Sequence, residues 1–238
     1  MSGDPGAILI TGCSSGIGRA TALRLARRGL RVYATARELG GMEELADAGC
    51  ELLELDVTDE ASARAAVAAV ESASGGAVGA LVNNAGYGQS GAIEAVPPDA
   101  VLRQFETNVL GYVRMAQLVL PGMRARGSGR IVVMSSVAGR VTMPGAGFYS
   151  STKFAIEAIA DALRFEVRGF GIDVSIVEPG PIRTEFTATA NAGSTRQRAA
   201  AARTRRSTPR WRRPTPRPIP RDCWPATPRT WRGSSSAR

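Results

Sequence analysis

Three features of the sequence predict an α/β fold built around a parallel sheet. Short, almost wholly apolar runs typical of strands alternate with longer Ala- and Leu-rich stretches typical of helices. Strands that are apolar on both faces are typical of a parallel sheet covered by helices on both sides. A glycine-rich turn joins the first apolar run to the first helical stretch. Together these features predict a single, doubly wound domain of the Rossmann type.

Each element follows from the alternation of apolar runs and turn residues. Residues 7–10 form the first continuous apolar run, and Gly127-Ser128-Gly129 separates a long helical stretch from the next apolar run. In chain order, we expect strands at 7–10, 31–35, 51–55, 80–82, 130–134 and 172–177. Between these strands we expect a first helix that ends near residue 28, three helices over 42–48, 59–74 and 99–126, and a last helix that ends near residue 168.

The first of these strands ends in a turn that carries three glycines. Gly12, Gly16 and Gly18 allow the backbone to turn tightly and to approach a pyrophosphate, which then rests on the N-terminus of the next helix. Glycines alone are a weak signal, because tight turns favour glycine in any case. Their place between the first strand and the first helix favours a dinucleotide site at the carboxyl ends of the strands.

Lysine occurs once in the 238 residues, against twenty-nine arginines, and this Lys153 follows Tyr149 by four positions. Residues four apart share a helix face, so the ammonium group would lie beside the phenol. A free phenol has a pKa of about 10, and nearby positive charge favours its ionised form. The pair therefore predicts a tuned proton donor, although a chance pair on a surface helix is the alternative.

Composition excludes several classes of chemistry. Histidine is absent, which removes Ser-His-Asp and Cys-His catalysis and most zinc sites, and we expect no metal. Three scattered cysteines are too few for a disulfide framework and indicate a reducing compartment. Neither a signal-peptide pattern nor a run of about 18 apolar residues is present, so we expect a soluble, cytoplasmic protein without a membrane partner.

Six motifs in one order carry a family resemblance. They are Thr11-Gly12-x-x-x-Gly16-Ile17-Gly18, Asn83-Asn84-Ala85-Gly86, Asn108, Ser136, Tyr149-x-x-x-Lys153 and Pro179-Gly180. With these motifs in register, the sequence over about residues 6–187 resembles the short-chain dehydrogenase/reductase family. Residues 32–37 and 149–158 resemble the steroid and retinoid dehydrogenase branch of that family.

The resemblance implies four catalytic residues. Tyr149 is similar to the family's general acid/base, and Lys153 to the lysine that lowers the pKa of that tyrosine and binds the nicotinamide ribose. Ser136 matches the serine that orients the substrate carbonyl, and Asn108 the asparagine that holds a water molecule for proton relay. Without the resemblance, Ser136 could simply end a strand and Asn108 could be a satisfied polar residue inside a helix.

The resemblance also implies the cofactor-binding residues, with Asp56 at the adenine ring and the loop 83–86 at the adenosine ribose. The full set is Gly12, Ser14, Ser15, Gly16, Ile17, Gly18, Arg37, Asp56, Val57, Asn83, Ala85, Gly86, Tyr149, Lys153, Pro179, Gly180, Ile182 and Thr184. Ala36 stands where NAD-specific sites place a carboxylate, and Arg37 follows it, which favours NADP(H) over NAD(H). A solvated surface arginine is the alternative interpretation of Arg37.

The expected function is an NADP(H)-dependent oxidoreductase that interconverts a ketone or aldehyde and an alcohol by hydride transfer. Residues 87–94 and 139–147, which mix small and apolar groups, are expected to line a pocket for a small hydrophobic substrate. The family resemblance implies a homodimer or homotetramer. The alternative is a catalytically inactive or regulatory NADP-binding protein whose basic tail binds nucleic acid.

The charge of the chain is unevenly distributed. Of its net charge of +9, residues 188–238 supply thirteen arginines, one acidic residue and seven prolines, whereas residues 1–187 carry a net charge of −3. We expect a catalytic domain at 1–187 and a disordered tail at 188–238, with the family's C-terminal helix and last strand missing. The tail could be an arm for nucleic acid or an anionic membrane, an inert linker or, the favoured interpretation, an out-of-frame translation.

Overall fold

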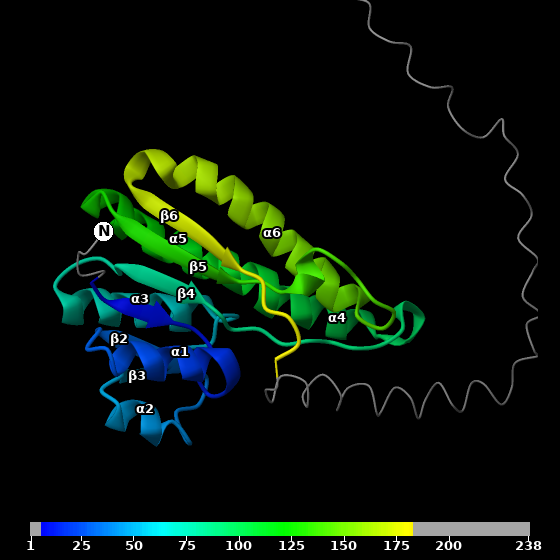
Figure 1. The fold of residues 1–238 in the computed structure, drawn as a ribbon, viewed down its shortest axis with the longest axis horizontal. Helices are drawn as coiled ribbons and strands as arrows, with labels where there is room; N and C mark the ends of the chain where they lie inside the picture. Colours follow the sequence, from blue (N-terminus) through cyan, green and yellow to red (C-terminus); the bar gives the residue numbers. More distant parts are fainter. Residues whose placement is uncertain (1–5, 183–238) are drawn as a thin grey trace, which may run out of the picture.

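The computed structural model describes residues 6–182, which form a six-stranded parallel sheet flanked by helices (Figure 1). The strand order is β3-β2-β1-β4-β5-β6, and every neighbouring pair is parallel. This is the doubly wound, Rossmann-type sheet that the alternation of apolar runs predicts. The expectations for Thr184 and for the tail at 188–238 lie outside the described residues.

The strands are β1 (Ile8–Ile10), β2 (Val32–Ala36), β3 (Glu51–Glu54), β4 (Ala80–Asn83), β5 (Gly129–Met134) and β6 (Ile172–Val177). The α-helices are α1 (Gly16–Ala26), α2 (Glu43–Asp47), α3 (Glu60–Ser74), α4 (Pro98–Phe105), α5 (Gly111–Arg126) and α6 (Gly147–Val167). Single turns of other helix types are η1 (Ile93–Ala95), η2 (Glu106–Leu110), η3 (Val137–Gly139) and η4 (Arg168–Phe170).

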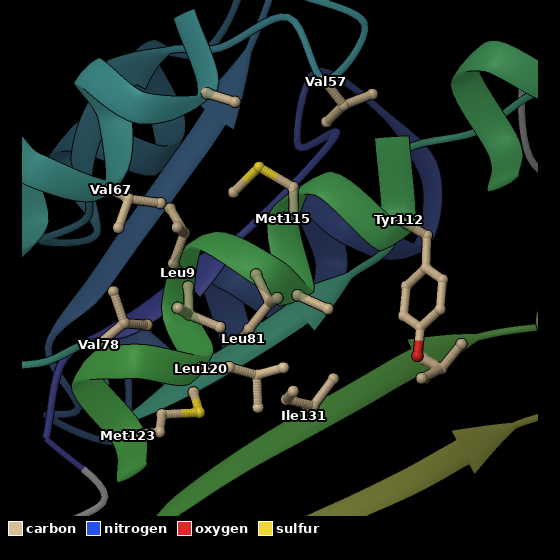
Figure 2. Close-up of a cluster of buried hydrophobic side chains, with 14 of the residues drawn as sticks. Leu9, Val57, Val67, Val78, Leu81, Tyr112, Met115, Leu120, Met123 and Ile131 are labelled. Atoms are coloured by element: carbon tan, nitrogen blue, oxygen red, sulfur yellow. The ribbon is translucent and has the colours of Figure 1, made fainter. Parts of the chain in front are cut away.

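The two faces of the sheet bury separate hydrophobic clusters. Leu9 of β1 belongs to a large cluster with residues of α3, α5 and α6, whereas its neighbours Ile8 and Ile10 belong to a second cluster with residues of α1 and α2. Figure 2 shows Leu81 and Ile131 of the sheet beside α5 in the large cluster. Successive strand residues therefore point to opposite covered faces, which explains why the central strands β2, β1 and β4 are buried along their whole length.

One expected helix, at 99–126, contains an irregular turn. It consists of α4, the π-helical turn η2 and α5, which follow one another without a break in the helical backbone. A π turn contains one residue more than the α-helical turn it replaces and is often found at functional sites. The η2 turn contains Asn108, so the irregularity lies at one of the predicted site residues.

Within residues 6–182, no helix is both long and apolar enough to cross a bilayer.

Candidate active site

The site begins in the crevice between β1 and β4, where the strand order reverses. The Thr11 hydroxyl accepts hydrogen bonds from the backbone N–H groups of Asn84 (3.0 Å) and Ala85 (2.9 Å). The Asn84 side-chain amide donates to the carbonyl oxygens of Thr11 and Gly12, each at 2.9 Å. These four bonds join the glycine turn after β1 to the loop after β4 and fix the floor of the crevice.

The glycines of this turn are required by space and by backbone conformation. Gly12 has a φ of +72° and Gly16 a φ of +60°, which side-chain-bearing residues rarely adopt. A Cβ atom at Gly18 would lie 2.3 Å from the Gly12 carbonyl oxygen. The turn can therefore pack against α1 only with glycine at these positions.

The N-terminus of α1 is open to an anion. No side chain caps it, and its first turn contains no acidic residue. By contrast, Asp59 caps α3 and accepts hydrogen bonds from Ala61 and Ser62. The N–H groups and the positive end of the helix dipole of α1 are suited to an anion such as a pyrophosphate, and the predicted residues Ser14, Ser15 and Ile17 lie at this terminus.

Three further predicted cofactor residues follow β2 and β3. Arg37 is exposed, and within residues 6–182 its guanidinium forms neither an ion pair nor a side-chain hydrogen bond. Partial burial opposes ionisation of Asp56, but hydrogen bonds from Thr58 (2.8 and 2.7 Å) hold the pKa of that carboxyl below its usual value. Val57 is 6% exposed and belongs to the large core cluster, and its backbone carbonyl oxygen accepts a hydrogen bond from Arg114.

The loops after β4 and β6 supply the remaining residues of the set. Asn83 turns away from the loop, because its side-chain amide donates to the Tyr112 carbonyl oxygen at 3.1 Å. Pro179, after β6, accepts hydrogen bonds from the Val137 N–H (3.1 Å) and the Ser136 hydroxyl (3.4 Å). This arrangement places Pro179 and Gly180 beside the η3 turn, and the described chain ends nearby at Ile182, which is exposed.

Tyr149 and Lys153 lie one turn apart on α6, as their spacing predicts. The Lys153 Nζ atom lies 5.7 Å from the centre of the Tyr149 ring and donates a hydrogen bond to the Met134 carbonyl oxygen at 2.8 Å. The lysine is 7% exposed. Burial lowers the pKa of Lys153 to about 8, while the negative charge of Glu157 acts in the opposite direction.

The phenol of Tyr149 differs from the expectation in one respect. Burial raises its pKa above the ordinary value, and a hydrogen bond with the Ser136 side chain acts to lower it. The ammonium group of Lys153 is directed to the backbone of β5, where it donates to the Met134 carbonyl oxygen. The structure thus brings Ser136, Tyr149 and Lys153 together, and burial favours the neutral form of the phenol.

Asn108 lies behind this group in the η2 turn and is 3% exposed. Its side chain accepts from the Tyr87 N–H (3.0 Å) and donates to the Tyr87 carbonyl oxygen (2.9 Å) and the Thr152 hydroxyl (3.1 Å). Thr152 in turn donates to the Tyr149 carbonyl oxygen at 2.7 Å. Asn108 therefore connects the loop after β4 to the helix that carries the tyrosine, and its oxygen lies 3.1 Å from a Cβ built on Gly86.

The sequence did not single out four side chains that shape the site: Thr11, Asn84, Thr152 and Glu157. Thr11 and Asn84 belong to the predicted motifs without an assigned role, although the Asn84 amide braces the glycine turn. Thr11 and Thr152 are 0% exposed, and a threonine at the end of an apolar run is the available signal for Thr11. Glu157 occupies a helix position that the pattern cannot distinguish from a solvated one.

The sequence matches a family model and several known proteins. A family model described as short chain dehydrogenase matches residues 6–195. The uncharacterized oxidoreductase YbbO of Escherichia coli (strain K12) is 40% identical over 184 residues, which cover 77% of this chain and 68% of YbbO. The 17-beta-hydroxysteroid dehydrogenase type 1 of Mus musculus is 42% identical over 212 residues, which cover 83% of this chain and 61% of that enzyme.

A solved structure has the same architecture. A short-chain dehydrogenase from Streptomyces avermitilis superimposes with a TM-score of 0.73 at 41% sequence identity, over 77% of this chain and 67% of that protein. The matched segments cover 68%, 61% and 67% of the lengths of these three proteins, in the order given.

Proposed function

Since the chain belongs to the short-chain dehydrogenase family, NAD(P)-dependent oxidoreductases that act on CH–OH groups, we propose that it interconverts a ketone or aldehyde and the matching alcohol with NADP(H). The observation that supports this proposal most directly is the environment of the partly buried Tyr149 phenol. The phenol bonds to Ser136 on one side and has the chain's only lysine one helical turn away.

In the proposed reaction, the bound nicotinamide supplies or accepts the hydride. When a carbonyl is reduced, the hydride adds to its carbon and the oxygen takes the proton of the Tyr149 hydroxyl. Ser136 orients the carbonyl oxygen toward that proton. Lys153 would bind the nicotinamide ribose beside Tyr149. Asn108 would hold the water molecule through which the proton of Tyr149 is resupplied. Gly12, Gly16 and Gly18, together with the open N-terminus of α1, cradle the pyrophosphate.

The protonation of Tyr149 favours reduction at neutral pH. A phenol whose pKa is raised by burial keeps its proton, which is the form that a proton donor needs. Oxidation of an alcohol needs the ionised phenol and would gain from alkaline pH. The proposed direction at neutral pH is therefore carbonyl reduction.

The proposed preference for NADP(H) depends on Arg37. Its guanidinium is exposed and unpaired within residues 6–182, at the end of β2, where the 2′-phosphate of NADP would lie. The nearest strand residue is Ala36, so no carboxylate at that position competes with the phosphate. A charge-assisted pair between guanidinium and phosphate supports NADPH over NADH.

The proposed substrate is a hydrophobic ketone or alcohol. The two segments expected to line the pocket, 87–94 and 139–147, meet: Gly91 N–H donates to the Gly145 carbonyl oxygen at 2.9 Å. Ile93, Val141 and Met143 on these segments are 61–69% exposed, which is unusual for large apolar side chains outside a binding surface. The similarity to a hydroxysteroid dehydrogenase supports the same class of substrate.

We also propose a homodimer or homotetramer in the cytoplasm. Large apolar side chains remain exposed on α4 and α6, with Leu102 at 70% and Phe165 at 78%. A second copy of the chain would cover such residues. Cys13 and Cys50 are buried free thiols, as in proteins of reducing compartments.

The proposed reaction is tested by measuring NADPH oxidation with aliphatic, aromatic and steroidal ketones, with Tyr149→Phe as the control. The wild type should turn over at least one class, and the variant should lose about 10²–10⁴-fold in kcat while still binding NADPH. Wild-type protein that binds NADPH without turning over any ketone, aldehyde or alcohol would contradict the proposal and indicate a regulatory protein.

A further inference from the structure

Glu157, one helical turn after Lys153 on α6, carries a buried carboxylate that the proposed reaction does not use. Its side chain is 5% exposed, and neither of its oxygens receives a hydrogen bond within the described residues. Its one ion pair there joins Oε2 to the Arg140 Nη2 atom at 2.9 Å, in a contact without hydrogen-bond geometry. A buried and poorly paired carboxylate costs free energy, so a compensating interaction is required.

Arg140 compensates this charge only in part. It is half exposed and donates two hydrogen bonds, from Nε (3.2 Å) and Nη2 (2.9 Å), to the carboxylate of Glu178 after β6. One guanidinium therefore serves two carboxylates, and the group of three residues keeps a net negative charge. Of the three groups, the Glu157 carboxylate lies on α6, on the same helix face as the Lys153 ammonium.

The surroundings of Lys153 supply few other charges. Tyr149 and Glu157 come from α6, Arg140 follows the η3 turn, and Glu178 follows β6. Among these, Glu157 is the group whose charge acts on the lysine, raising its pKa while burial lowers it. The ammonium has a hydrogen bond to one backbone carbonyl, Met134, and needs further stabilisation to stay charged in a buried position.

The position of Glu157 is fixed by packing. A Cβ atom built on Gly139 would lie 3.0 Å from the Glu157 Cγ atom and 3.0 Å from the Ser135 hydroxyl oxygen. The η3 turn, which Ser136 caps, thus lies directly on the Glu157 side chain. The carboxylate cannot swing out to solvent without displacing this turn.

We propose that Glu157 is a positioning residue whose carboxylate keeps the buried Lys153 ammonium protonated, with Arg140 limiting the strength of that effect. The catalytic consequence rests on the proposed function, because a neutral lysine would no longer hold the nicotinamide ribose in place beside Tyr149. The electrostatic part does not require turnover and can be measured in the protein without cofactor.

The chain offers a direct probe, because it contains a single lysine. Full-length protein labelled with [ε-¹³C]lysine gives one side-chain signal, whose shift with pH reports the titration of Lys153. In Glu157→Gln the midpoint should fall by about 1 pH unit, since a neutral amide no longer favours the ammonium. In Arg140→Gln it should rise, since the carboxylate then acts on the lysine without a competing cation.

Shifts of the Lys153 midpoint in opposite directions in Glu157→Gln and Arg140→Gln would show that the effect comes from charge and not from altered packing. An unchanged midpoint in Glu157→Gln, or a fall in Arg140→Gln as large as that in Glu157→Gln, would overturn the proposal. Glu157→Asp keeps the charge, and its midpoint should lie closer to that of the wild type than the midpoint of Glu157→Gln. If Glu157→Gln does not fold, Arg140→Gln still decides, because a midpoint that does not rise contradicts the proposal.

Activity then reports the consequence for catalysis. In Glu157→Gln the alkaline fall of kcat for ketone reduction should begin about 1 pH unit lower, with the KM for the ketone within about twofold of wild type. A loss of kcat at every pH would indicate a purely structural role. If the lysine midpoints shift as expected but no ketone is reduced, the positioning role stands and the proposed function fails.

Discussion

The half of the sheet from β1 to β3 and the half from β4 to β6 contribute to the site in different ways. The first half offers mainly backbone: the glycine turn at Gly12 to Gly18 and the uncapped N-terminus of α1. The second half offers side chains on rigid elements, namely Ser136, Tyr149 and Lys153. Binding by backbone is sensitive to added volume, whereas proton transfer is sensitive to the loss of one functional group.

Added volume in the glycine turn should have the largest effect on cofactor binding. In Gly18→Ala the new methyl group would meet the Gly12 carbonyl oxygen at 2.3 Å and the Asn84 amide nitrogen at 2.5 Å. We expect the Kd for NADPH to rise about 100-fold, about 3 kcal/mol, as measured by calorimetric titration. Gly76→Ala, where no atom lies within 4 Å of the added Cβ, should leave this Kd unchanged. Equal effects of the two substitutions would contradict the assignment of the turn.

Loss of a side chain in the second half should instead reduce stability and turnover. Asn108→Ala removes three hydrogen bonds, to Tyr87 and Thr152, from a buried position. We expect the free energy of unfolding in urea to fall by about 2–3 kcal/mol, at about 1 kcal/mol per bond. Thr107→Ala, at a partly exposed neighbouring position whose hydroxyl donates one solvent-exposed hydrogen bond to the Arg103 carbonyl oxygen, should lower it by less than about 1 kcal/mol. A small effect of Asn108→Ala would show that these bonds do not hold the two elements together.

The first half also contains one side chain that is expected to discriminate between cofactors. Arg37→Ala should raise the KM for NADPH about 10–30-fold, through loss of one charge-assisted hydrogen bond, and leave the KM for NADH unchanged. Steady-state kinetics with both cofactors measure this difference. Arg64→Ala, which removes an exposed arginine from α3, is the matched control. Equal use of NADPH and NADH by the wild type would also contradict the assignment of Arg37.

The smallest expected effect comes from a cap on α1. Ser15→Asp would place a carboxylate at the open N-terminus, where the residue already has an extended backbone. We expect the unfolding free energy without cofactor to rise by about 0.5–1 kcal/mol and the Kd for NADPH to rise roughly fivefold, because the carboxylate competes with pyrophosphate. Asp59→Ala on α3 should cost about 1 kcal/mol and leave the Kd for NADPH unaltered. Tighter NADPH binding by Ser15→Asp would mean that the pyrophosphate does not rest on α1.

Most of the architecture was predictable, because buried parallel strands are continuous apolar runs. Strands were expected at 31–35 and 172–177, and the structure has Val32–Ala36 and Ile172–Val177. The π turn at 106–110 was not predictable, since it adds one residue without changing the helical character of the sequence. The η1 and η3 turns were also missed, because each has only three residues and depends on tertiary contacts.

Within the site, spacing predicted the shared face of Tyr149 and Lys153 but could not give the environment of either group. The raised pKa of Tyr149 comes from its burial in the folded chain, which the spacing of the two residues does not reveal. Sequence also cannot tell which way a side chain points at a strand end: Asn83 contacts α5, whereas Asn84 contacts the glycine turn. Glu157 is missed for the same reason, because only the packed η3 turn makes its position buried.

The π turn at Glu106–Leu110 changes the direction in which the side chains of α4 point around the helix axis relative to those of α5. Each residue of an α-helix rotates the chain by about 100°, so one extra residue turns everything before it by that angle relative to everything after it. Deleting a single residue there would restore regular helical hydrogen bonding and yet rotate α4 away from its contacts. Homologous chains of this fold should therefore tolerate many exchanges of residue type in this turn but conserve its length.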